Sequence, residues 1–379
     1  MASGFTEQAL PTWRRAVLKV GSSLLTTPEG ALTGENADAL AAFVTASRDA
    51  GREVVIVSSG AVAAGRGLAP APDRSTGLSG RQALAALGQT RLVGLWQTFF
   101  DAPVAQVLLT HDDLRNRRRY LNARTTLREL LALGAIPVIN ENDTVAVDEL
   151  KLGDNDNLAA IVAALVDADV LFIASDIPGL YTADPRTVPS ALPVPDLAEV
   201  TQAHLDSAGG AGSAAGTGGM RTKLDAAIKA AAAGIETVLF DGRDTRCIAR
   251  LADGMLTGTR LRAPQSRLAA RKYWLRHAPA AGRISVDTGA LDALRGRGAS
   301  LLPGGVVDAA GEFARGDVVE ILAEGTVLAR GVAQYSATDV RRIARRHTRD
   351  IEAVLGYSYG ETIVHRDDLV ILPDPARTA

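Results

Sequence analysis

The stretch EVVIVSSGAVAAG, residues 53–65, joins a β-branched run to an alanine-rich run through two serines and a glycine. A continuous aliphatic run of this kind is typical of a strand that is buried on both faces of a parallel sheet. Small hydroxyl residues before a glycine are typical of a loop that opens a helix N-terminus, where an anion can bind. The stretch therefore predicts a strand, a ligand-binding loop and a helix in succession.

The same alternation recurs on both sides of this stretch. Further strand-like runs lie at residues 16–20, 104–109, 136–140, 169–174 and 237–240. Between them lie Ala/Leu-rich segments in which apolar residues recur at helical spacing. In the first helical segment we expect Thr33 to be the N-cap and Gly51 to end the helix. Alternating strands and helices predict a largely parallel sheet covered on both faces, with ligands bound at the carboxyl ends of its strands.

The pattern changes after residue 255. Residues 256–282 are basic and flanked by Gly and Pro, which predicts a partly helical linker, and residues 283–372 show short β-like runs with one helical insert. Such a profile predicts a small, mainly β, barrel-like domain. Residues 260–379 hold 18 basic and 14 acidic residues, a net charge of +4, whereas the rest of the chain has a net charge of −6.

Composition restricts the class of protein. The chain has 379 residues, 47% of them hydrophobic and 22% charged, and a single cysteine, Cys247, which we interpret as a small buried apolar residue. One cysteine excludes an intrachain disulfide and favours a reducing compartment. With neither a signal-peptide pattern nor a long apolar run, we expect a cytoplasmic protein without membrane contact.

Lysine is rare and its positions are informative. Of 41 basic residues only five are lysines, and three of these, Lys19, Lys151 and Lys223, lie in glycine-containing segments. A compact ammonium group binds phosphate as a point charge, which the planar guanidinium of arginine does not reproduce. These lysines therefore indicate phosphate chemistry.

Five loops combine glycines or several polar side chains in patterns that suit ligand binding. The loops at 19–23 and 58–62 offer glycine amides and hydroxyls, although each alone is also explained by a strand-to-helix turn or an N-cap. The loops at 140–143 and 153–157 hold more polar groups than a turn or an N-cap needs, which favours substrate recognition. The loop at 216–223 combines glycines, a threonine and a lysine at a helix start, the components of a phosphate cradle. Residues 175–182 are either a contact to a nucleotide or only a tight turn.

These loops form an ordered set of motifs: VLKVGSS, VSSGAVAAG, VINENDTV, KLGDNDNLAA, SDIPGLYTADPR and GTGGMRTK. Together they resemble the glutamate 5-kinases of the amino-acid kinase family, and SLLPGGV and GYSYGETIVHRDDLVIL resemble the PUA domain appended to them. The resemblance implies a three-layer α/β/α sandwich with a mostly parallel sheet over residues 14–255. A linker over 256–282 and a PUA domain over 283–372 follow.

The resemblance also implies the activity: ATP-dependent phosphorylation of the γ-carboxylate of L-glutamate, the first step of proline biosynthesis. The implied ATP contacts are Lys19, Ser175, Asp176, Thr217, Gly218, Gly219, Met220, Arg221, Thr222 and Lys223. The implied substrate contacts are Ser59, Asp143 and Asn155, and the phosphate cradle is Gly21, Ser22 and Gly60. Ser175 stands where the family is expected to have threonine, and the Ala/Gly-rich stretch before Thr217 is unusual.

The chemistry of a carboxylate acceptor agrees with these residues. The substrate carboxylate is already ionised at pH 7, so no general base is needed. We expect Lys19 and Lys223 to neutralise charge in the transition state, Asp156 to orient them, and Mg²⁺ to be held mainly by the ATP phosphates. Asp143 would pair with the substrate α-ammonium group, which N-acetylglutamate lacks.

Further partners follow only from the resemblance: feedback inhibition by proline and a homo-oligomer, either a tetramer or a dimer. Two alternatives stay open. One is another small-molecule kinase of the family, acting on carbamate, acetylglutamate, aspartate, UMP or isopentenyl phosphate. The other is an RNA-binding or RNA-modifying protein, suggested by the arginine-rich segment 341–350, although a solvated helix face explains that segment equally well. We expect RNA binding through the PUA domain to be weak and salt-dependent.

Overall fold

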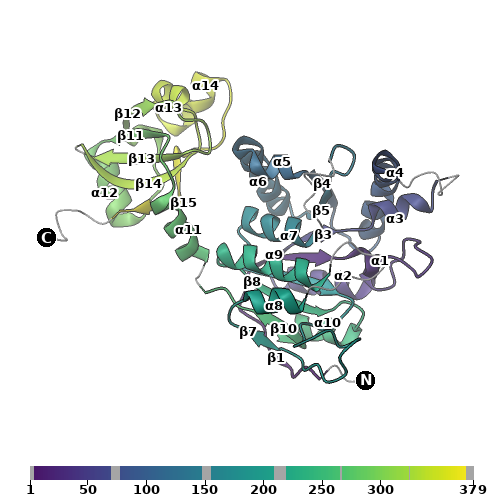
Figure 1. The fold of residues 1–379 in the computed structure, drawn as a ribbon. Helices are drawn as coiled ribbons and strands as arrows, with labels where there is room; N and C mark the ends of the chain where they lie inside the picture. Colours follow the sequence, from purple (N-terminus) through teal and green to yellow (C-terminus); the bar gives the residue numbers. More distant parts are fainter. Residues whose placement is uncertain are drawn as a thin grey trace. The chain divides into compact units, whose positions relative to one another are not determined.

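The computed structural model describes residues 4–69, 77–146, 155–208, 219–264, 267–323 and 325–372. The chain divides into two compact units, Met1–Arg267 and Leu268–Ala379 (Figure 1). Among the described residues, no helix combines the length and the apolar character needed to cross a membrane.

An eight-stranded sheet forms the centre of the first unit, in the order β4-β5-β3-β2-β6-β8-β10-β7. The strands are β2 (Arg15–Val20), β3 (Glu53–Ser58), β4 (Val104–Leu109), β5 (Ile136–Glu141), β6 (Val170–Ser175), β7 (Asp196–Leu197), β8 (Glu236–Asp241) and β10 (Gly258–Leu261). The six strands from β4 to β8 in this order are parallel to one another, and β10 is antiparallel to β8. A separate short pair joins β1 (Gln8–Ala9) to β9 (Met255–Leu256).

Helices cover both faces of this sheet (Figure 1). They are α1 (Ser22–Leu25), α2 (Ala37–Asp49), α3 (Ala61–Arg66), α4 (Leu78–Gln97), α5 (His111–Arg115), α6 (Arg117–Ala132), α7 (Asn155–Leu165), α8 (Gln202–Ser207), α9 (Met220–Ala232) and α10 (Thr245–Ala252). In β2, Leu18 packs in one apolar core with α2, α4 and α10, whereas its neighbour Val17 packs in a second core with α6, α7 and α9. Successive side chains of a strand point to opposite faces, so the unit has three layers, as predicted. Lys19 lies on the α7 and α9 face with Val17.

Two glycines bring α3 and α4 into backbone contact. A Cβ at Gly65 would lie 1.9 Å from the Leu84 carbonyl oxygen, and a Cβ at Gly88 would lie 1.9 Å from the Ala61 carbonyl oxygen. No larger residue fits at either position without separating the helices. This contact holds the middle of α4 against the start of α3, which directly follows the loop Ser59–Gly60.

The ends of α2 differ in part from expectation. The helix begins after Asn36 rather than Thr33, because Gly34 and Asn36 form a turn in which the Ala37 amide donates to the Gly34 carbonyl. Gly51 has a φ of +75° just beyond the last turn, as a helix-ending glycine should.

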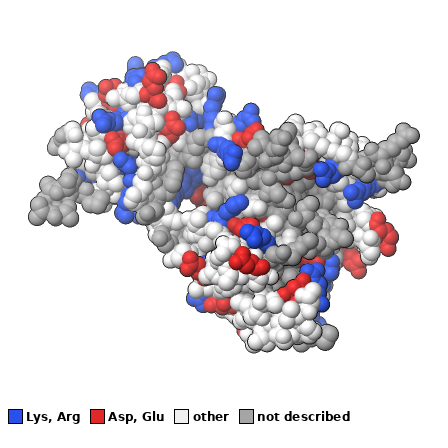
Figure 2. Space-filling view, viewed as in Figure 1, with Lys and Arg blue, Asp and Glu red and all other residues white. Residues whose placement is uncertain are grey.

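The second unit is built on a five-stranded sheet in the order β12-β11-β13-β14-β15. Its strands are β11 (Gly282–Val286), β12 (Val306–Gly311), β13 (Val318–Ala323), β14 (Thr326–Ala333) and β15 (Val364–Ile371), and its helices are α11 (Arg267–His277), α12 (Thr288–Arg297), α13 (Ala337–Ile343) and α14 (Ile351–Leu355). Basic and acidic side chains are interspersed over the face of this unit that Figure 2 shows. The predicted mainly β character is confirmed, but α12 was not expected, and the single expected helical insert is interrupted at Arg345, whose φ is +60°.

The region expected to be a linker, 256–282, is largely regular structure and is divided between the two units. Residues Gly258–Leu261 form β10 of the large sheet, and Arg267–His277 form α11. The end of α11 belongs to the second unit, because Leu275 packs with Val332 and the Arg330 guanidinium donates to the carbonyls of Arg276 and Ala278. The basic composition of this region concealed the few apolar residues that anchor it.

Candidate active site

A buried carboxylate between two lysines forms the centre of the site. Asp156 is fully buried in the first turn of α7, and Lys19 of β2 and Lys223 of α9 are 5% and 7% exposed. The Lys19 ammonium contacts Oδ1 of Asp156, and the Lys223 Nζ lies 3.0 Å from Oδ2. The Thr222 hydroxyl also lies 3.0 Å from Oδ2. Three segments that are far apart in the sequence thus meet at one carboxylate.

The charges of this cluster determine its protonation. Burial alone would raise the pKa of the Asp156 carboxyl, but the two ammonium groups outweigh burial and lower this pKa from 3.8 to about 2. Asp156 is therefore ionised at neutral pH. The three charges sum to +1, so the cluster offers a buried positive charge to an anionic ligand.

Two glycines shape the loops beside the lysines. A Cβ at Gly21 would lie 3.5 Å from the Lys19 Nζ, so Gly21 lies directly beside the ammonium group. Gly60 has a φ of +114°, which residues with a side chain rarely adopt. Ser22 follows Gly21 as the first residue of α1. The structure therefore places the three expected cradle residues at the ends of β2 and β3.

A network of side-chain amides lies next to this cluster. The Asn155 Nδ2 lies 2.7 Å from the Ser59 hydroxyl and 2.9 Å from Oδ1 of Asn140. Asn140 in turn donates to Oε1 of Gln89 at 2.9 Å. The structure thus brings together the expected substrate contacts Ser59 and Asn155 with Asn140, the first residue of the expected recognition loop 140–143, and it adds Gln89, which the sequence did not single out.

Asp143 lies in the turn that follows β5. It is half-buried, and it comes three residues after Asn140, which lies near the end of β5. The turn is tied to the sheet because the Asn142 amide donates to the Leu109 carbonyl of the neighbouring strand. Asp143 therefore lies just beyond the carboxyl end of β5, the strand that carries Asn140 of the amide network.

A pocket opens at Lys223. Its lining includes five of the residues expected to contact ATP, namely Ser175, Asp176, Gly219, Met220 and Lys223. Tyr181 and Arg186 line it as well; both belong to the motif SDIPGLYTADPR, but nothing in the sequence distinguishes them from the other residues of that motif. Lys223 belongs both to this pocket and to the Asp156 cluster.

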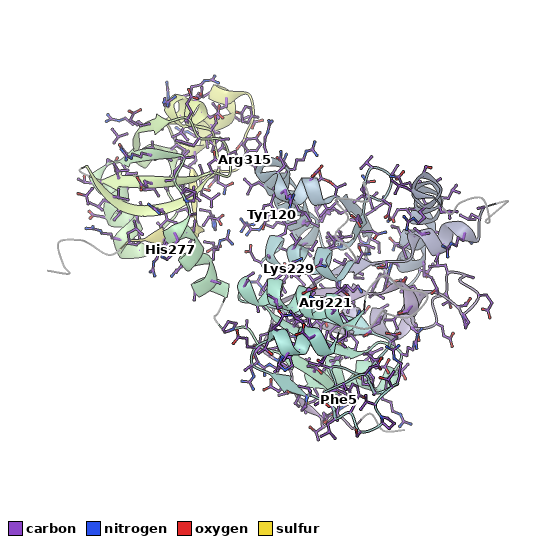
Figure 3. All side chains as sticks on the ribbon, viewed as in Figure 1. Phe5, Tyr120, Arg221, Lys229, His277 and Arg315 are labelled. Carbon is purple, nitrogen blue, oxygen red and sulfur yellow. The ribbon has the colours of Figure 1, made fainter. Side chains whose placement is uncertain are left out.

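Three of the expected ATP contacts that the structure describes, Lys19, Arg221 and Thr222, do not line this pocket. Thr222 does not line the pocket, because its hydroxyl faces Asp156, and Arg221 is exposed with a guanidinium nitrogen 3.5 Å from the Leu205 carbonyl (Figure 3). Thr217 and Gly218 lie outside the described residues. Of the loop 216–223, the structure therefore describes only residues 219–223.

The N-terminal segment supports the wall of this pocket. The ring of Phe5, labelled in Figure 3, belongs to this segment. It meets Tyr181 edge to face with 5.3 Å between centroids, and Gly179 leaves no space for a Cβ, which would lie 2.8 Å from the Phe5 ring. Burial, followed by the charge of Asp241, raises the pKa of Tyr181. Tyr181 therefore stays a neutral hydrogen-bonding group at the pocket.

The described residues contain no group of three His, Cys, Asp or Glu side chains that could enclose a metal ion. At the cluster itself the charged groups are two ammonium groups held by one carboxylate, and the pocket adds Asp176, Asp184 and Arg186. Such a set suits phosphate oxygens directly, and a divalent cation would be bound together with those phosphates.

Comparisons with known proteins identify the family of the chain. The profile of the amino acid kinase family matches residues 14–241, and that of the PUA domain matches residues 282–355. Glutamate 5-kinases of Xanthomonas euvesicatoria pv. vesicatoria and Xanthomonas oryzae pv. oryzae are 67% and 68% identical over 362 residues, which cover 94% of this chain and 100% of each relative. Glutamate 5-kinase of Xylella fastidiosa is 63% identical over 377 residues, 98% of both chains. The chain therefore belongs to the amino acid kinase family, among the glutamate 5-kinases, and carries a PUA domain in its C-terminal part.

Proposed function

We propose that the protein transfers the γ-phosphoryl group of ATP to the γ-carboxylate of L-glutamate and so forms L-glutamyl 5-phosphate, in the first step of proline biosynthesis. One observation supports this most strongly. Lys223 lines the nucleotide pocket and contacts Asp156, while the adjacent Asn155 bonds Ser59, an expected substrate contact. The two buried ammonium groups thus lie between a site for a nucleotide and a site for a small polar acceptor.

The reaction needs positioning and charge neutralisation rather than proton transfer. The γ-carboxylate of glutamate is ionised at pH 7 and is itself the nucleophile. Lys19 and Lys223 stabilise the negative charge on the transferring phosphoryl group and its bridging oxygen, and Asp156 holds both ammonium groups in place. The glycine amides at 21 and 60 complete the cradle. The cation Mg²⁺ is held by the phosphates of ATP and lowers their charge.

Asp143 selects the acceptor. Its carboxylate pairs with the α-ammonium group of free L-glutamate, and Ser59 and Asn155 bind the carboxylate groups. N-acetylglutamate has no cation for Asp143, so it is rejected with an unpaired carboxylate left behind. Proline, which keeps the α-carboxylate and the amine nitrogen, competes at the same place and inhibits by feedback.

The remaining partners follow from the family. The enzyme forms a homo-oligomer, a dimer or a tetramer, and works in the cytoplasm, where ATP is supplied. RNA contact through the second unit is weak and depends strongly on salt. Two of the five arginines in 341–350 are used internally, because Arg341 donates to the carbonyls of Ala309 and Gly311 and Arg342 contacts the Val354 carbonyl. Acidic groups are also interspersed with the basic ones on the face seen in Figure 2.

The test is ADP release by the purified protein with Mg-ATP and one acceptor at a time: L-glutamate, N-acetylglutamate, aspartate, carbamate, UMP or isopentenyl phosphate. We expect turnover with L-glutamate only. Turnover with a phosphorylated acceptor and none with glutamate would overturn the proposal and leave the kinase fold. A filter-binding assay with structured RNA at low and moderate salt tests the second unit separately.

A further inference from the structure

Gln89 carries a buried donor that no described residue accepts. It lies in α4, is 7% exposed, and its Oε1 accepts a hydrogen bond from Asn140 Nδ2 at 2.9 Å. Its Nε2 is buried without a hydrogen-bond partner among the described residues. A buried N–H group that lacks an acceptor is unfavourable, so a native structure usually has a reason to keep one.

The orientation of this amide is fixed by the backbone. The Glu141 N–H can only donate, and it donates to Oδ1 of Asn140 at 2.9 Å. Asn140 must therefore donate through its Nδ2 to Gln89, and Gln89 must accept through its Oε1. Exchanging the oxygen and nitrogen of Gln89 would set two donors against each other, so the free group is the amide nitrogen.

The position of Gln89 connects it to the acceptor side of the site. Asn140 bonds both Gln89 and Asn155, and Asn155 bonds Ser59. The contact between Gly88 and the Ala61 carbonyl fixes this part of α4 against the helix that follows Ser59 and Gly60. Gln89 is thus a rigid member of the amide network and not a mobile side chain near it.

An N–H donor selects a ligand with an oxygen acceptor and offers nothing to an ammonium group. We propose that Gln89 Nε2 donates to a carboxylate oxygen of the bound L-glutamate and is a specificity-determining residue of the acceptor site. The inference rests on the proposed function, since it assigns one more contact to the same substrate. It divides the acceptor site into a donor side at Gln89 and Asn155 and an acceptor side at Asp143.

Two substitutions separate this role from a structural one. Gln89→Met keeps the length of the side chain and removes both polar groups, so we expect the KM for L-glutamate to rise about tenfold or more while the KM for ATP changes less than about twofold. Gln89→Glu keeps the oxygen that Asn140 needs and replaces the donor. Its buried carboxyl repels the substrate when ionised and donates an O–H when protonated, so its glutamate KM, relative to the unmodified enzyme at the same pH, should fall as the pH is lowered.

Gln97→Met in the same helix is the matched control. Gln97 is bonded at both ends of its amide, to the Val104 amide and to the Phe100 and Ala102 carbonyls, so its loss should affect the melting temperature and not the KM for glutamate. A glutamate KM of folded Gln89→Met that equals that of the unmodified enzyme would overturn the inference. If Gln89→Met fails to fold, a glutamate KM of Gln89→Glu that follows the unmodified enzyme at every pH would overturn it instead. Absence of glutamate turnover by the unmodified enzyme would refute the proposed function itself, which is a different result.

Discussion

Replacing Asp156 by asparagine tests the charge cluster most sharply, because the change alters one oxygen and almost no volume. In the folded protein Asp156 is fully buried and contacts both Lys19 and Lys223. Asparagine leaves two buried ammonium groups close together with no counter-charge. We expect loss of folding stability and loss of activity from the same substitution.

The size of the stability change follows from the pKa. The two lysines lower the pKa of Asp156 from 3.8 to about 2, and at roughly 1.4 kcal/mol per pKa unit this corresponds to about 2–3 kcal/mol. Breaking a buried ion pair by removing one partner costs about 3–5 kcal/mol, because the remaining charge is uncompensated. We therefore expect Asp156→Asn to lower the free energy of unfolding at pH 7 by about 2–5 kcal/mol.

The same shift fixes the pH dependence. Because the folded-state pKa is lowered, the contribution of Asp156 is complete above about pH 4 and is lost as the pH falls toward 2. The difference in stability between the native protein and Asp156→Asn should therefore narrow, by about 1 kcal/mol at pH 3.

Urea unfolding followed by circular dichroism at pH 7, 4 and 3 measures both effects. Asp225→Asn is the control, since Asp225 is only partly buried on the same helix as Lys223 and its replacement should stay within about 0.5 kcal/mol. Equal stability of Asp156→Asn and the native protein at pH 7, or a difference that does not narrow toward pH 3, would refute the reasoning.

Three further predictions concern single residues. Lys223→Met should lower kcat by roughly 10²–10³-fold with an unchanged circular dichroism spectrum, and a kcat close to native would remove Lys223 from the reaction. Asp143→Asn should raise the KM for L-glutamate by about tenfold or more and leave the KM for ATP unchanged; steady-state kinetics with an unaltered glutamate KM would contradict its pairing with the α-ammonium group. Burial raises the pKa of the Cys247 thiol to about 11, so only about a thousandth is thiolate at pH 8, and a disulfide reagent should react in urea but not with the folded protein. Rapid reaction of the folded protein would show that this part of α10 opens.

Much of the first unit could be predicted from the sequence because its strands are buried on both faces. All six expected runs are strands, and each strand end lies within one residue of the expected position. The runs 53–58 and 104–109 match at both ends. The lysines at 19 and 223 were marked by their glycine neighbours, and the structure brings both to Asp156. In each case the residue types within a short stretch of sequence were enough to indicate the strand or the site residue.

The parts that could not be predicted depend on tertiary contacts. Gln89 and Trp96 lie in a helix with an ordinary apolar pattern, and nothing local indicates that they bond Asn140 and Ser58, which are 51 and 38 residues away. The predicted start of α2 at Thr33 was wrong for the same reason. The side-chain amide of Asn36 donates a hydrogen bond to the Leu24 carbonyl, a contact that the local sequence does not indicate. Polar residues whose partners are distant in sequence leave no periodic trace.

Trapping the product tests acyl phosphate formation directly. With Mg-ATP, L-glutamate and hydroxylamine, we expect γ-glutamyl hydroxamate in equal amount to the ADP released, because an acyl phosphate on the γ-carboxylate is the species that hydroxylamine attacks. ADP released without hydroxamate, or hydroxamate formed at the α-carboxylate, would contradict it.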